Sequence, residues 1–352
     1  MADTAIEWTD KTWNPMAGCS IVSAGCANCY AMKMAARVES MQWAHAAAGR
    51  PTNDKYEGLT KKVNGKTVWT GRVNFNESAL ALPLTWKKPK RIFVNSMSDL
   101  FHEDVSMDWI IDVFTIMALS PQHTFQVLTK RPERMRHVLR NDRCIELDIL
   151  KNAHKYQGGI SGGWGWPLPN VWLGVSVEDQ ATADARIPEL LKTPAAVRFV
   201  SYEPALGPVD FENVRHALAG DSFEVGSVLR GDDGFGQNAV RSRIDWLICG
   251  GESGPGARPM HPDWARSARD QCRAARVKFF FKQWGEWAPV TYHAAAGCEH
   301  DTLPTYQTAA HEVVALTTSK FCAGKRVGHL GKKAAGRILD GRTWDEFPEV
   351  PA

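Results

Sequence analysis

The sequence has no long apolar run and no strong excess of one charge, and its opening residues do not follow the pattern of a secretory leader. Across its 352 residues there is no run of about eighteen apolar residues, which is close to the length that a transmembrane helix needs. The opening residues, MADTAIEWTD, lack the basic and apolar regions of a signal peptide. Lys and Arg number 42 against 39 Asp and Glu, so the surface as a whole does not attract nucleic acid strongly. We therefore expect a cytoplasmic protein without a membrane partner, in which any basic groove is local.

The eight cysteines do not follow the pattern of a small secreted protein. Three of them, Cys19, Cys26 and Cys29, fall within eleven residues, and the others are far apart. A small secreted domain spreads its cysteines along the chain as a framework of disulfides. The clustered spacing instead indicates reduced thiols that bind a metal.

Short runs of β-branched and aromatic residues alternate with helical patterns along most of the chain. The predicted strands span residues 91–96, 125–129, 171–177, 197–203, 245–251 and 277–283. The predicted helices span residues 30–48, 106–120, 132–140, 181–192 and 261–276. Near-continuous apolarity within each strand is typical of parallel strands that are covered on both faces. The alternation predicts an α/β fold, specifically a partial (βα)6-type barrel over residues 1–290.

Three predicted insertions interrupt this alternation, at about residues 49–90, 141–170 and 206–244. The first contains Asn64-Gly65, a pair that is typical of a tight β-hairpin turn. Long insertions at the edge of a sheet often contact the substrate. Residues 291–352 form a C-terminal extension to which the sequence assigns no role.

Cys19, Cys26 and Cys29 lie in the segment GCSIVSAGCANCYA. Three thiolates without an evident fourth ligand suit a 4Fe-4S cluster in which one iron stays open. A structural zinc site usually has four ligands, so a zinc site here would need a distant fourth ligand. The candidates for that ligand are Cys144, Cys249, Cys272, Cys298 and Cys322. Both metal centres remain open from the cysteine spacing alone.

Each predicted strand ends in a group of polar residues. These groups are NSMSD, TKR, SVED, SYEP, GGES and KQWGE. The carboxyl ends of parallel strands lie on the same edge of a sheet, where α/β barrels hold their active sites. The pattern therefore predicts a site at that edge.

Several of these segments resemble known families. The cysteine segment, which ends in Cys-Tyr-Ala and precedes a helix, resembles the cluster loop of radical S-adenosylmethionine enzymes, and the βα pattern resembles their partial barrel. From about Ile6 to Trp287 the chain is also similar to a phage-protein family known for its three-cysteine motif. The segments that carry this similarity are IEWTDKTWNP, GCANCYA, FVNSMSDLFHEDV, VLTKRPERM, WLGVSVED, SYEPALGPV and ICGGESGPGARP. The cysteine spacing departs from the commonest radical-enzyme pattern, which has three residues rather than six between the first two cysteines.

The resemblance to radical enzymes implies two cofactors, a 4Fe-4S cluster and S-adenosylmethionine. In such enzymes the amino and carboxyl groups of S-adenosylmethionine chelate the open iron. An electron, which an external donor supplies to the cluster, then cleaves the sulfonium and gives a 5′-deoxyadenosyl radical. The protein is expected to position the cofactor and to exclude water.

The same resemblance implies roles for residues near the first strands. Tyr30 would pack near the adenine, although a core aromatic residue of a helix is an equal alternative. Acceptors for the methionine ammonium would be Asn95, Ser96, Ser98 and Asp99. Helix capping explains these four residues equally well. Thr129 and Lys130 follow the next strand, where Lys130 would pair with a carboxylate or phosphate or remain a solvated loop charge.

The later strands supply further candidates. Residues whose oxygens could bind the ribose hydroxyls or the methionine are Ser176, Glu178, Ser201 and Glu203. Glu252 follows Gly250-Gly251 and is expected to contact the substrate or the cofactor, and it is a candidate catalytic residue together with Glu203. Trp284 is a candidate surface for stacking on a base, with core packing as the alternative. His102 and His261 adjoin helix starts, where capping and packing explain them, and are left out of the site.

The substrate is predicted to be a nucleobase. The basic run WKKPKR, at residues 86–91, and the tryptophan-bearing loops suit a base and its phosphates. The phage resemblance, with a looser likeness of FVNSMSD and VLTKRP to the spore photoproduct lyase branch, implies modification or repair of DNA pyrimidines. The partner would then be DNA or a nucleotide. The alternative from another class is a zinc-stabilised nucleic-acid-binding protein without catalysis, which iron and sulfide content would distinguish.

Overall fold

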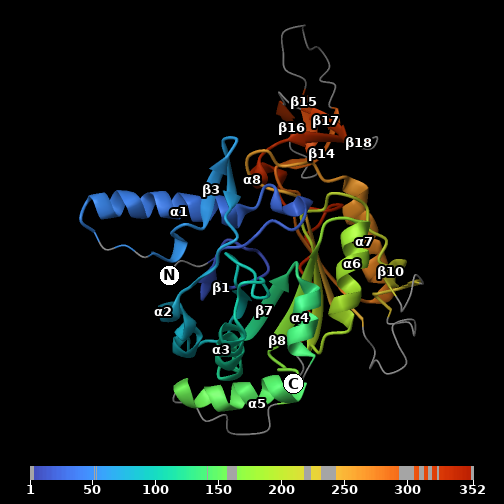
Figure 1. Ribbon diagram of the computed structural model, residues 1–352. Coiled ribbons are helices and arrows are strands. Elements are labelled where there is room, and N and C mark those ends of the chain that lie inside the picture. Colours follow the sequence, from blue (N-terminus) through green and yellow to red (C-terminus); the bar gives the residue numbers. More distant parts are fainter. Residues whose placement is uncertain are drawn as a thin grey trace. The chain divides into compact units, whose positions relative to one another are not determined.

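The chain divides into two compact units, which are described separately below. The computed structural model (Figure 1) describes residues 4–50, 52, 54–140, 142–156, 165–217, 223–230, 243–292, 305–308, 313–315, 319–322 and 325–349. Unit 1 comprises Met1–Val175, Glu189–Arg198 and Glu349–Ala352. Unit 2 comprises Ser176–Pro188 and Phe199–Pro348. No helix among the described residues is long and apolar enough to cross a membrane.

Seven parallel strands form the principal sheet, in the order β1-β6-β7-β8-β9-β12-β13. Their bounds are Lys11–Trp13 for β1, Arg91–Val94 for β6, Thr124–Thr129 for β7, Val171–Val177 for β8, Val197–Tyr202 for β9, Trp246–Gly250 for β12 and Lys278–Gln283 for β13. This order follows the chain without reversal. A segment of a βα barrel has such a singly wound order, whereas a doubly wound sheet reverses at a switch point.

The α/β class and the six predicted strands are confirmed, and β1 is a seventh strand that the sequence analysis did not predict. All seven residues of β8 and all five of β12 are buried. Burial at successive positions means that both faces of these strands are covered, as their continuous apolarity predicted.

The five predicted helices are confirmed, and three of them begin at a capping residue or a proline. Helices of the structure are α1 (Tyr30–Ala47), α3 (Met107–Ala118), α4 (Pro132–Leu139), α5 (Asp142–Ala153), α6 (Gln180–Leu191) and α7 (Pro262–Ala275). Ser106 caps α3 because its hydroxyl accepts a hydrogen bond from the backbone N–H of Trp109 at 3.2 Å. α4 and α7 each have a proline in their first turn, where a missing N–H costs nothing.

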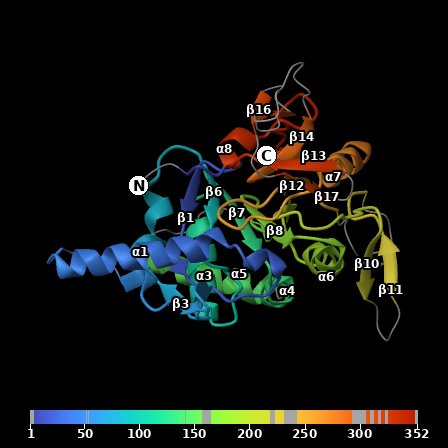
Figure 2. The same ribbon diagram turned by 90° about the horizontal axis from the view of Figure 1, so that it is seen from above.

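Unit 1 contains the first predicted insertion. The hairpin of β3 (Thr60–Val63) and β4 (Lys66–Trp69) turns at Asn64-Gly65, as predicted, and both residues have positive φ angles, 48° and 75°. Figure 2 shows the hairpin beside α1, where Trp69 joins Met32 and Ala35 in a buried cluster. The other short elements of unit 1 are β2 (Met16–Ala17), η1 (Ala24–Cys26), η2 (Asp54–Tyr56), β5 (Asn74–Phe75), α2 (Glu77–Leu80) and η3 (Leu82–Thr85).

The second predicted insertion contains helix α5 and the turn η4 (His154–Tyr156), and its residues 157–164 lie outside the described part. The third contains the antiparallel pair β10 (Val214–Ala217) and β11 (Phe223–Gly226). Residues 218–222 and 231–242 of that insertion, including most of RGDDGFGQN, also lie outside it.

The C-terminal extension contributes to an antiparallel sheet in unit 2. Its order is β16-β15-β14-β18-β17. The bounds are Trp287–Tyr292 for β14, Thr305–Thr308 for β15, Val313–Ala315 for β16, Ser319–Cys322 for β17 and Lys325–His329 for β18, with α8 at Lys332–Ala335. Trp246 of β12 donates its indole N–H to the carbonyl of Glu346 at 2.9 Å, so the end of the chain packs on the parallel sheet within unit 2.

Candidate cluster and cofactor site

The three cysteines of unit 1 lie on one loop between β2 and α1. Cys19, Cys26 and Cys29 are free thiols and are half-buried. Gly18 anchors the start of the loop, because its backbone N–H donates to the carbonyl of Met97 at 3.0 Å. Gly18 has a φ of 104°, and a Cβ there would lie 2.1 Å from the carbonyl oxygen of Arg72, so only glycine fits. The loop is therefore held against the turn that follows β6.

Arg131 and Asp99 form a buried ion pair beside this loop. Nη1 of Arg131 lies 3.0 Å from Oδ2 of Asp99, and the side chains are only 10% and 8% exposed. The same Nη1 lies 3.7 Å from the sulfur of Cys19. Arg131 also donates from Nε to Glu103 at 2.8 Å and from Nη2 to Ser20 at 2.5 Å. A single guanidinium thus joins the cysteine loop to the ends of β6 and β7.

The carboxylate of Asp99 is saturated by internal donors. Its two oxygens accept hydrogen bonds from the Thr129 hydroxyl at 2.7 Å and the Phe101 N–H at 3.0 Å, and from the Lys130 N–H at 3.1 Å and Arg131 at 3.0 Å. Thr129 in turn accepts from the backbone N–H of Arg131 at 2.9 Å. Asp99 therefore links the turn after β6 to the end of β7, and an ammonium could reach Asp99 only by displacing one of these donors.

Lys130 also contacts the cysteine loop. Its Nζ donates to the hydroxyl of Ser23 at 3.3 Å, and Ser23 lies 3.8 Å from the sulfur of Cys26. Lys130 and Arg131 thus bring two positive charges to a loop that holds three thiols. Thiolates are stabilised by such neighbours.

Burial raises the pKa of Cys19 to about 12, with a further rise from the charge of Asp99 that Arg131 opposes only in part. Burial also raises the pKa of Cys29. Both sulfurs therefore hold their protons near neutral pH in the metal-free chain. A metal has to displace these protons when it binds.

Zinc and a 4Fe-4S cluster place different demands on the three thiols. Among the described residues, no group of three or more His, Cys, Asp and Glu side chains converges so that it could hold a metal ion. A zinc ion requires ligands that meet at one point, at about 2.3 Å from each sulfur. A cubane cluster binds each cysteine at a different iron, so the sulfurs surround the cube instead of meeting at one point. The described residues therefore show no ready-made site for a mononuclear metal, and the cluster stays a prediction.

Two of the distant candidates for a fourth zinc ligand lie in the core of unit 2. Cys249 in β12 and Cys272 in α7 are completely buried. Burial raises the pKa of both thiols well above the usual value, so they pack as small apolar groups. The side chains of Cys144, Cys298 and Cys322 lie outside the described residues.

Asn95 is the least satisfied polar residue of the turn after β6. Its side chain is buried, 3% exposed, and neither its amide oxygen nor its amide nitrogen has a hydrogen-bond partner among the described residues. Its backbone has a φ of 57°, which non-glycine residues rarely adopt. Leaving such an amide unpaired costs about 1–3 kcal/mol. Both features are expected where a polar ligand completes the site.

The other predicted residues of this turn make local contacts. Tyr30 is half-exposed, so it is not a core aromatic residue, and its hydroxyl donates to the carbonyl of Ser96 at 2.7 Å. The Ser96 hydroxyl donates to Oδ1 of Asn14 at 3.1 Å, and the Ser98 hydroxyl donates to the carbonyl of Met16 at 3.3 Å. The structure therefore brings Tyr30, Asn95, Ser96 and Ser98 together around one turn.

Unit 2 holds a second group of predicted residues. Glu203, which follows β9, accepts two hydrogen bonds from Nζ of Lys282, at 2.7 and 2.9 Å. Nε2 of Gln283 lies 3.5 Å from the same carboxylate, and Ser176 donates to the backbone carbonyl of Glu203 at 3.1 Å. Ser201 is buried in β9. The ends of β8, β9 and β13 thus meet at Glu203.

Glu178 and Glu252 are also paired with cations. Glu178 is buried and accepts from Nη1 of Arg186 at 3.3 Å. Glu252 accepts from Nη2 of Arg258 at 2.6 Å and from its Nε at 2.9 Å. The carboxylate of Glu252 is 5% exposed, so the bidentate pair compensates a buried charge.

The glycines before Glu252 serve the packing of two backbones. A Cβ at Gly251 would lie 2.0 Å from the carbonyl oxygen of Trp284, and one at Gly285 would lie 2.0 Å from that of Glu252. Trp284 is 1% exposed and donates its indole N–H to the carbonyl of Ile338 at 2.9 Å. The proposed stacking role of Trp284 is therefore wrong in this structure, and the core-packing alternative is correct.

Of the two histidines that were left out of the site, His261 caps α7, whereas His102 lies in a turn and its Nε2 is 3.0 Å from the hydroxyl of Ser20 in the cysteine loop. His102 accepts from the backbone N–H of Asp104 at 3.1 Å, and His261 accepts from that of Asp263 at 3.1 Å. The sequence analysis placed Arg131, the last residue of the TKR group, at a strand end but assigned it no role. The available signal was the proline that follows Arg131, because a proline directly after a strand marks the start of a helix and so fixes the position of the residue before it.

Comparison with known proteins identifies the family of this chain. A family profile with the description "Protein of unknown function (DUF5131)" matches residues 3–348. The chain belongs to this family. No curated protein and no solved structure matches the chain. The DUF5131 description states no activity, so the resemblances to phage three-cysteine proteins and to radical S-adenosylmethionine enzymes stay predictions for this chain.

Proposed function

We propose that this protein is a radical S-adenosylmethionine enzyme with a 4Fe-4S cluster on Cys19, Cys26 and Cys29. The observation that carries the proposal is the link between the thiol loop and the turn of Asn95. Gly18 fixes the loop to Met97 of that turn, and the turn holds a buried amide without a partner among the described residues. A cofactor that chelates a cluster needs the metal-binding loop and, beside it, a polar side chain that can bind the cofactor.

The residues that would hold the two cofactors have distinct tasks. When bound, the cluster and S-adenosylmethionine would supply a 5′-deoxyadenosyl radical that abstracts hydrogen from the substrate, after reduction by an external donor. Arg131 and Lys130 offset the negative charge of the three thiolates. Asp99 orients Arg131 and compensates its buried charge. Tyr30 presents its ring to the adenine.

Asn95 is the preferred partner for the methionine ammonium. The ammonium needs an oxygen acceptor, and the carboxylate oxygens of Asp99 already accept from internal donors. Oδ1 of Asn95 has no such donor among the described residues. Ser96 and Ser98 hold the turn in place, and Thr129 holds Asp99.

The polar group of unit 2 is proposed to contact the substrate. The Lys282 ammonium and the Glu203 carboxylate together offer donors and an acceptor, as do Arg258 and Glu252. A pyrimidine presents both kinds of group on its edge, so such pairs suit a nucleobase of DNA or of a nucleotide. Ser176, Glu178 and Ser201 remain candidates for the ribose hydroxyls and for the methionine.

Metal content and cofactor cleavage test the proposal. The protein is purified without oxygen, reconstituted with iron and sulfide, and analysed for both and for zinc. Reduced protein is then incubated with S-adenosylmethionine, and 5′-deoxyadenosine is quantified by chromatography. We expect about four irons per chain and 5′-deoxyadenosine that forms only with a reductant. A colourless protein that contains zinc and no iron would instead establish the zinc-stabilised binding protein.

A further inference from the structure

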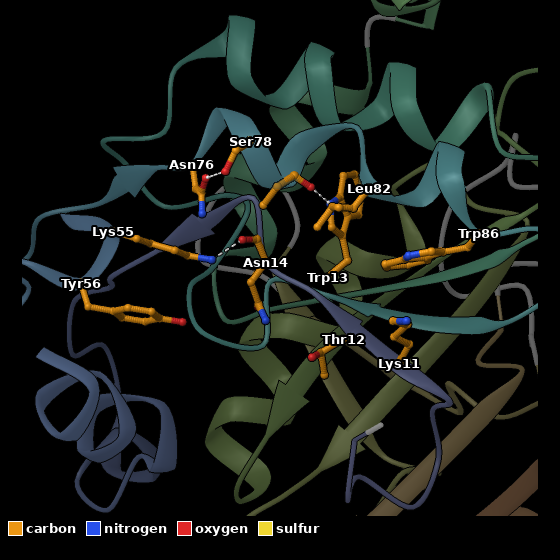
Figure 3. A pocket seen from close by; sticks show the side chains of 11 residues that line it. Lys11, Thr12, Trp13, Asn14, Lys55, Tyr56, Asn76, Ser78, Leu82 and Trp86 are labelled. Carbon is orange, nitrogen blue, oxygen red and sulfur yellow. Dashed lines mark hydrogen bonds between the residues drawn. The ribbon is translucent and has the colours of Figure 1, made fainter. Parts of the chain in front are cut away.

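Unit 1 contains a pocket of about 520 Å³ that the proposed chemistry does not use (Figure 3). It lies at the end of β1 and is bounded by η2, α2 and η3. Ligand pockets usually measure about 300–1,000 Å³, so its volume suits a small molecule or one residue of a polymer. Its floor and walls include Lys11, Trp13, Asn14, Lys55, Tyr56 and Trp86.

On each of two sides of the pocket an aromatic ring lies beside a lysine. Figure 3 shows Tyr56 and Lys55 on one side and Trp86 and Lys11 on the other. Nζ of Lys11 lies 4.4 Å from the centre of the Trp86 ring. Trp86 is half-buried, so part of its ring stays accessible to a ligand. A planar ligand ring could pack on such an indole, as bases do on aromatic side chains.

The charge of the pocket is positive. Lys11 and Lys55 line it, and none of the described residues that line it carries a carboxylate. Burial lowers the pKa of Lys55 to about 8, because its ammonium is partly removed from water. Lys87 and Lys88, which follow Trp86 in the chain, are exposed. A lining of this charge attracts an anion.

Asn14 connects the pocket to the proposed cofactor turn. Its backbone carbonyl accepts a hydrogen bond from Nζ of Lys55. Its Oδ1 accepts from the Ser96 hydroxyl and from the Met97 N–H, both at 3.1 Å. The wall of the pocket and the turn that holds Asn95 thus share one residue.

We propose that this pocket binds a nucleoside phosphate, with the base against Trp86 and the phosphate toward Lys55 and Lys11. The combination of an aromatic wall, two ammonium groups and no lining carboxylate matches a base with an attached phosphate. The ligand is either a free nucleotide or one nucleotide of a single strand. The site goes beyond the proposed radical chemistry, because binding there requires neither the cluster nor S-adenosylmethionine.

Equilibrium binding to the full chain tests the site. The probes are 5′-nucleoside monophosphates, a fluorescent single-stranded oligonucleotide, inorganic phosphate and an acidic peptide of equal charge. We expect nucleotide or oligonucleotide to bind and both controls to bind at least tenfold more weakly. A preference of more than tenfold for the oligonucleotide identifies a single strand as the source, and comparable affinities identify the free nucleotide. Equal binding of phosphate or of the peptide overturns the proposal.

Two variants locate the binding. Trp86→Ala should weaken binding about 5- to 100-fold, the range that loss of one base–aromatic stack gives, and Trp86→Phe should restore most of it. The matched control is Trp43→Ala, because Trp43 is 70% exposed on α1 and does not line the pocket. Lys55→Gln should weaken binding at least fivefold, and Lys61→Gln on β3 should not. Thermal melting checks that each variant is folded.

Unchanged affinity in folded Trp86→Ala and Lys55→Gln would overturn the site. This result is distinct from failure of the radical proposal. If Cys26→Ala abolishes the cluster and retains nucleotide affinity, the two sites are independent. If the wild type binds nucleotide and contains no iron, the radical proposal alone fails.

Discussion

Arg131 and Asp99 form an ion pair at 3.0 Å in which both side chains are about nine-tenths buried. The pair lies beside Cys19, since the same guanidinium nitrogen is 3.7 Å from its sulfur. A buried pair contributes little when intact, because desolvation of two charges offsets their attraction. Its value here is that it holds one positive charge at a fixed place beside the thiol loop.

Breaking this pair should destabilise the protein strongly. Asp99→Asn retains the volume of the side chain but leaves the charge of Arg131 without its buried partner, at a cost of about 3–5 kcal/mol in the free energy of unfolding. Urea unfolding measures the loss. The matched control is Asp10→Asn, whose pair with Arg91 is 36% and 40% exposed and should contribute less than about 1 kcal/mol. Equal losses in the two variants would contradict the role of the buried pair.

Loss of a cluster cysteine should remove the metal. Cys26→Ala is expected to abolish iron binding after reconstitution, because a cubane needs all three thiolates of the loop. Cys272→Ala serves as the control, since that thiol lies in the core of unit 2 and should retain the full iron content. Iron and sulfide analysis with visible absorption gives the readout. Full iron in Cys26→Ala would remove the cluster from this loop.

Asn95→Gly separates cofactor binding from stability. Glycine adopts a φ of 57° without strain, and the substitution removes an amide that has no partner among the described residues. We expect the free energy of unfolding to stay the same or rise, and the affinity for S-adenosylmethionine to fall at least tenfold with iron retained. Calorimetric titration of the reconstituted protein measures the affinity. A loss of stability without a loss of affinity would assign Asn95 to the fold alone.

The stability of the protein should fall as the solution becomes mildly acidic. Burial lowers the pKa of His102, to which Arg131 adds, and burial also lowers the pKa of His123. Below about pH 6.5 the unfolded chain binds protons at these histidines that the folded chain resists, so folding loses up to about 1.4 kcal/mol per pH unit for each residue. Urea unfolding between pH 7.5 and 5.5 measures the slope. His102→Asn can still accept a hydrogen bond from the backbone N–H of Asp104 and should reduce this slope. An unchanged slope would contradict the assignment of the pH dependence to His102.

The strands and helices followed from local patterns in the sequence. β8 and β12 are buried along their whole length, which agrees with the continuous apolar runs from which they were predicted. β1 escaped prediction because it has three residues, Lys11–Trp13, too few for a periodic pattern. β1 is defined by its parallel pairing with β6, a long-range contact that no local sequence pattern reports.

The site followed from the sequence only where its residues are close along the chain. The three thiols are neighbours on one loop, and their spacing indicated a metal. The pair of Arg131 and Asp99 joins two strand ends across 32 positions, which no local pattern encodes. Trp284 shows the opposite error, because a tryptophan beside glycine looks like a loop residue but is 1% exposed.

The nucleotide pocket was missed for the same reason. Its residues come from separate segments: residues 11–14, residues 55–56, the group Asn76, Ser78, Ala79 and Leu82, and Trp86. Only Trp86, at the start of the basic run, gave any signal in the sequence. The exposed Lys87 and Lys88 fit the predicted contact with phosphates, whereas Arg91 is paired with Asp10.

The affinity of the pocket for a nucleotide should fall as the pH rises above about 8. Burial lowers the pKa of Lys55 to about 8, so the empty pocket loses this charge in mildly alkaline solution. A bound phosphate favours the ammonium and raises its pKa, so affinity is retained below the pKa of the empty pocket and is lost progressively above it. The phosphate is already doubly charged above pH 7, because its second pKa is about 6, and it cannot cause the loss. Tyr56 cannot cause it either, since burial raises its pKa and keeps the phenol neutral.

Titrations of the monophosphate at pH 7, 8 and 9 measure this effect at constant ionic strength. Each pH unit above the pKa of Lys55 should reduce affinity up to about tenfold, because one proton is then taken up on binding. Lys55→Arg is the matched control, since a guanidinium stays charged over this range and its binding should be flat. Lys61→Arg, a substitution outside the pocket, should keep the slope of the wild type. If Lys55→Arg lost affinity with pH as steeply as the wild type, Lys55 would not be the group that meets the phosphate.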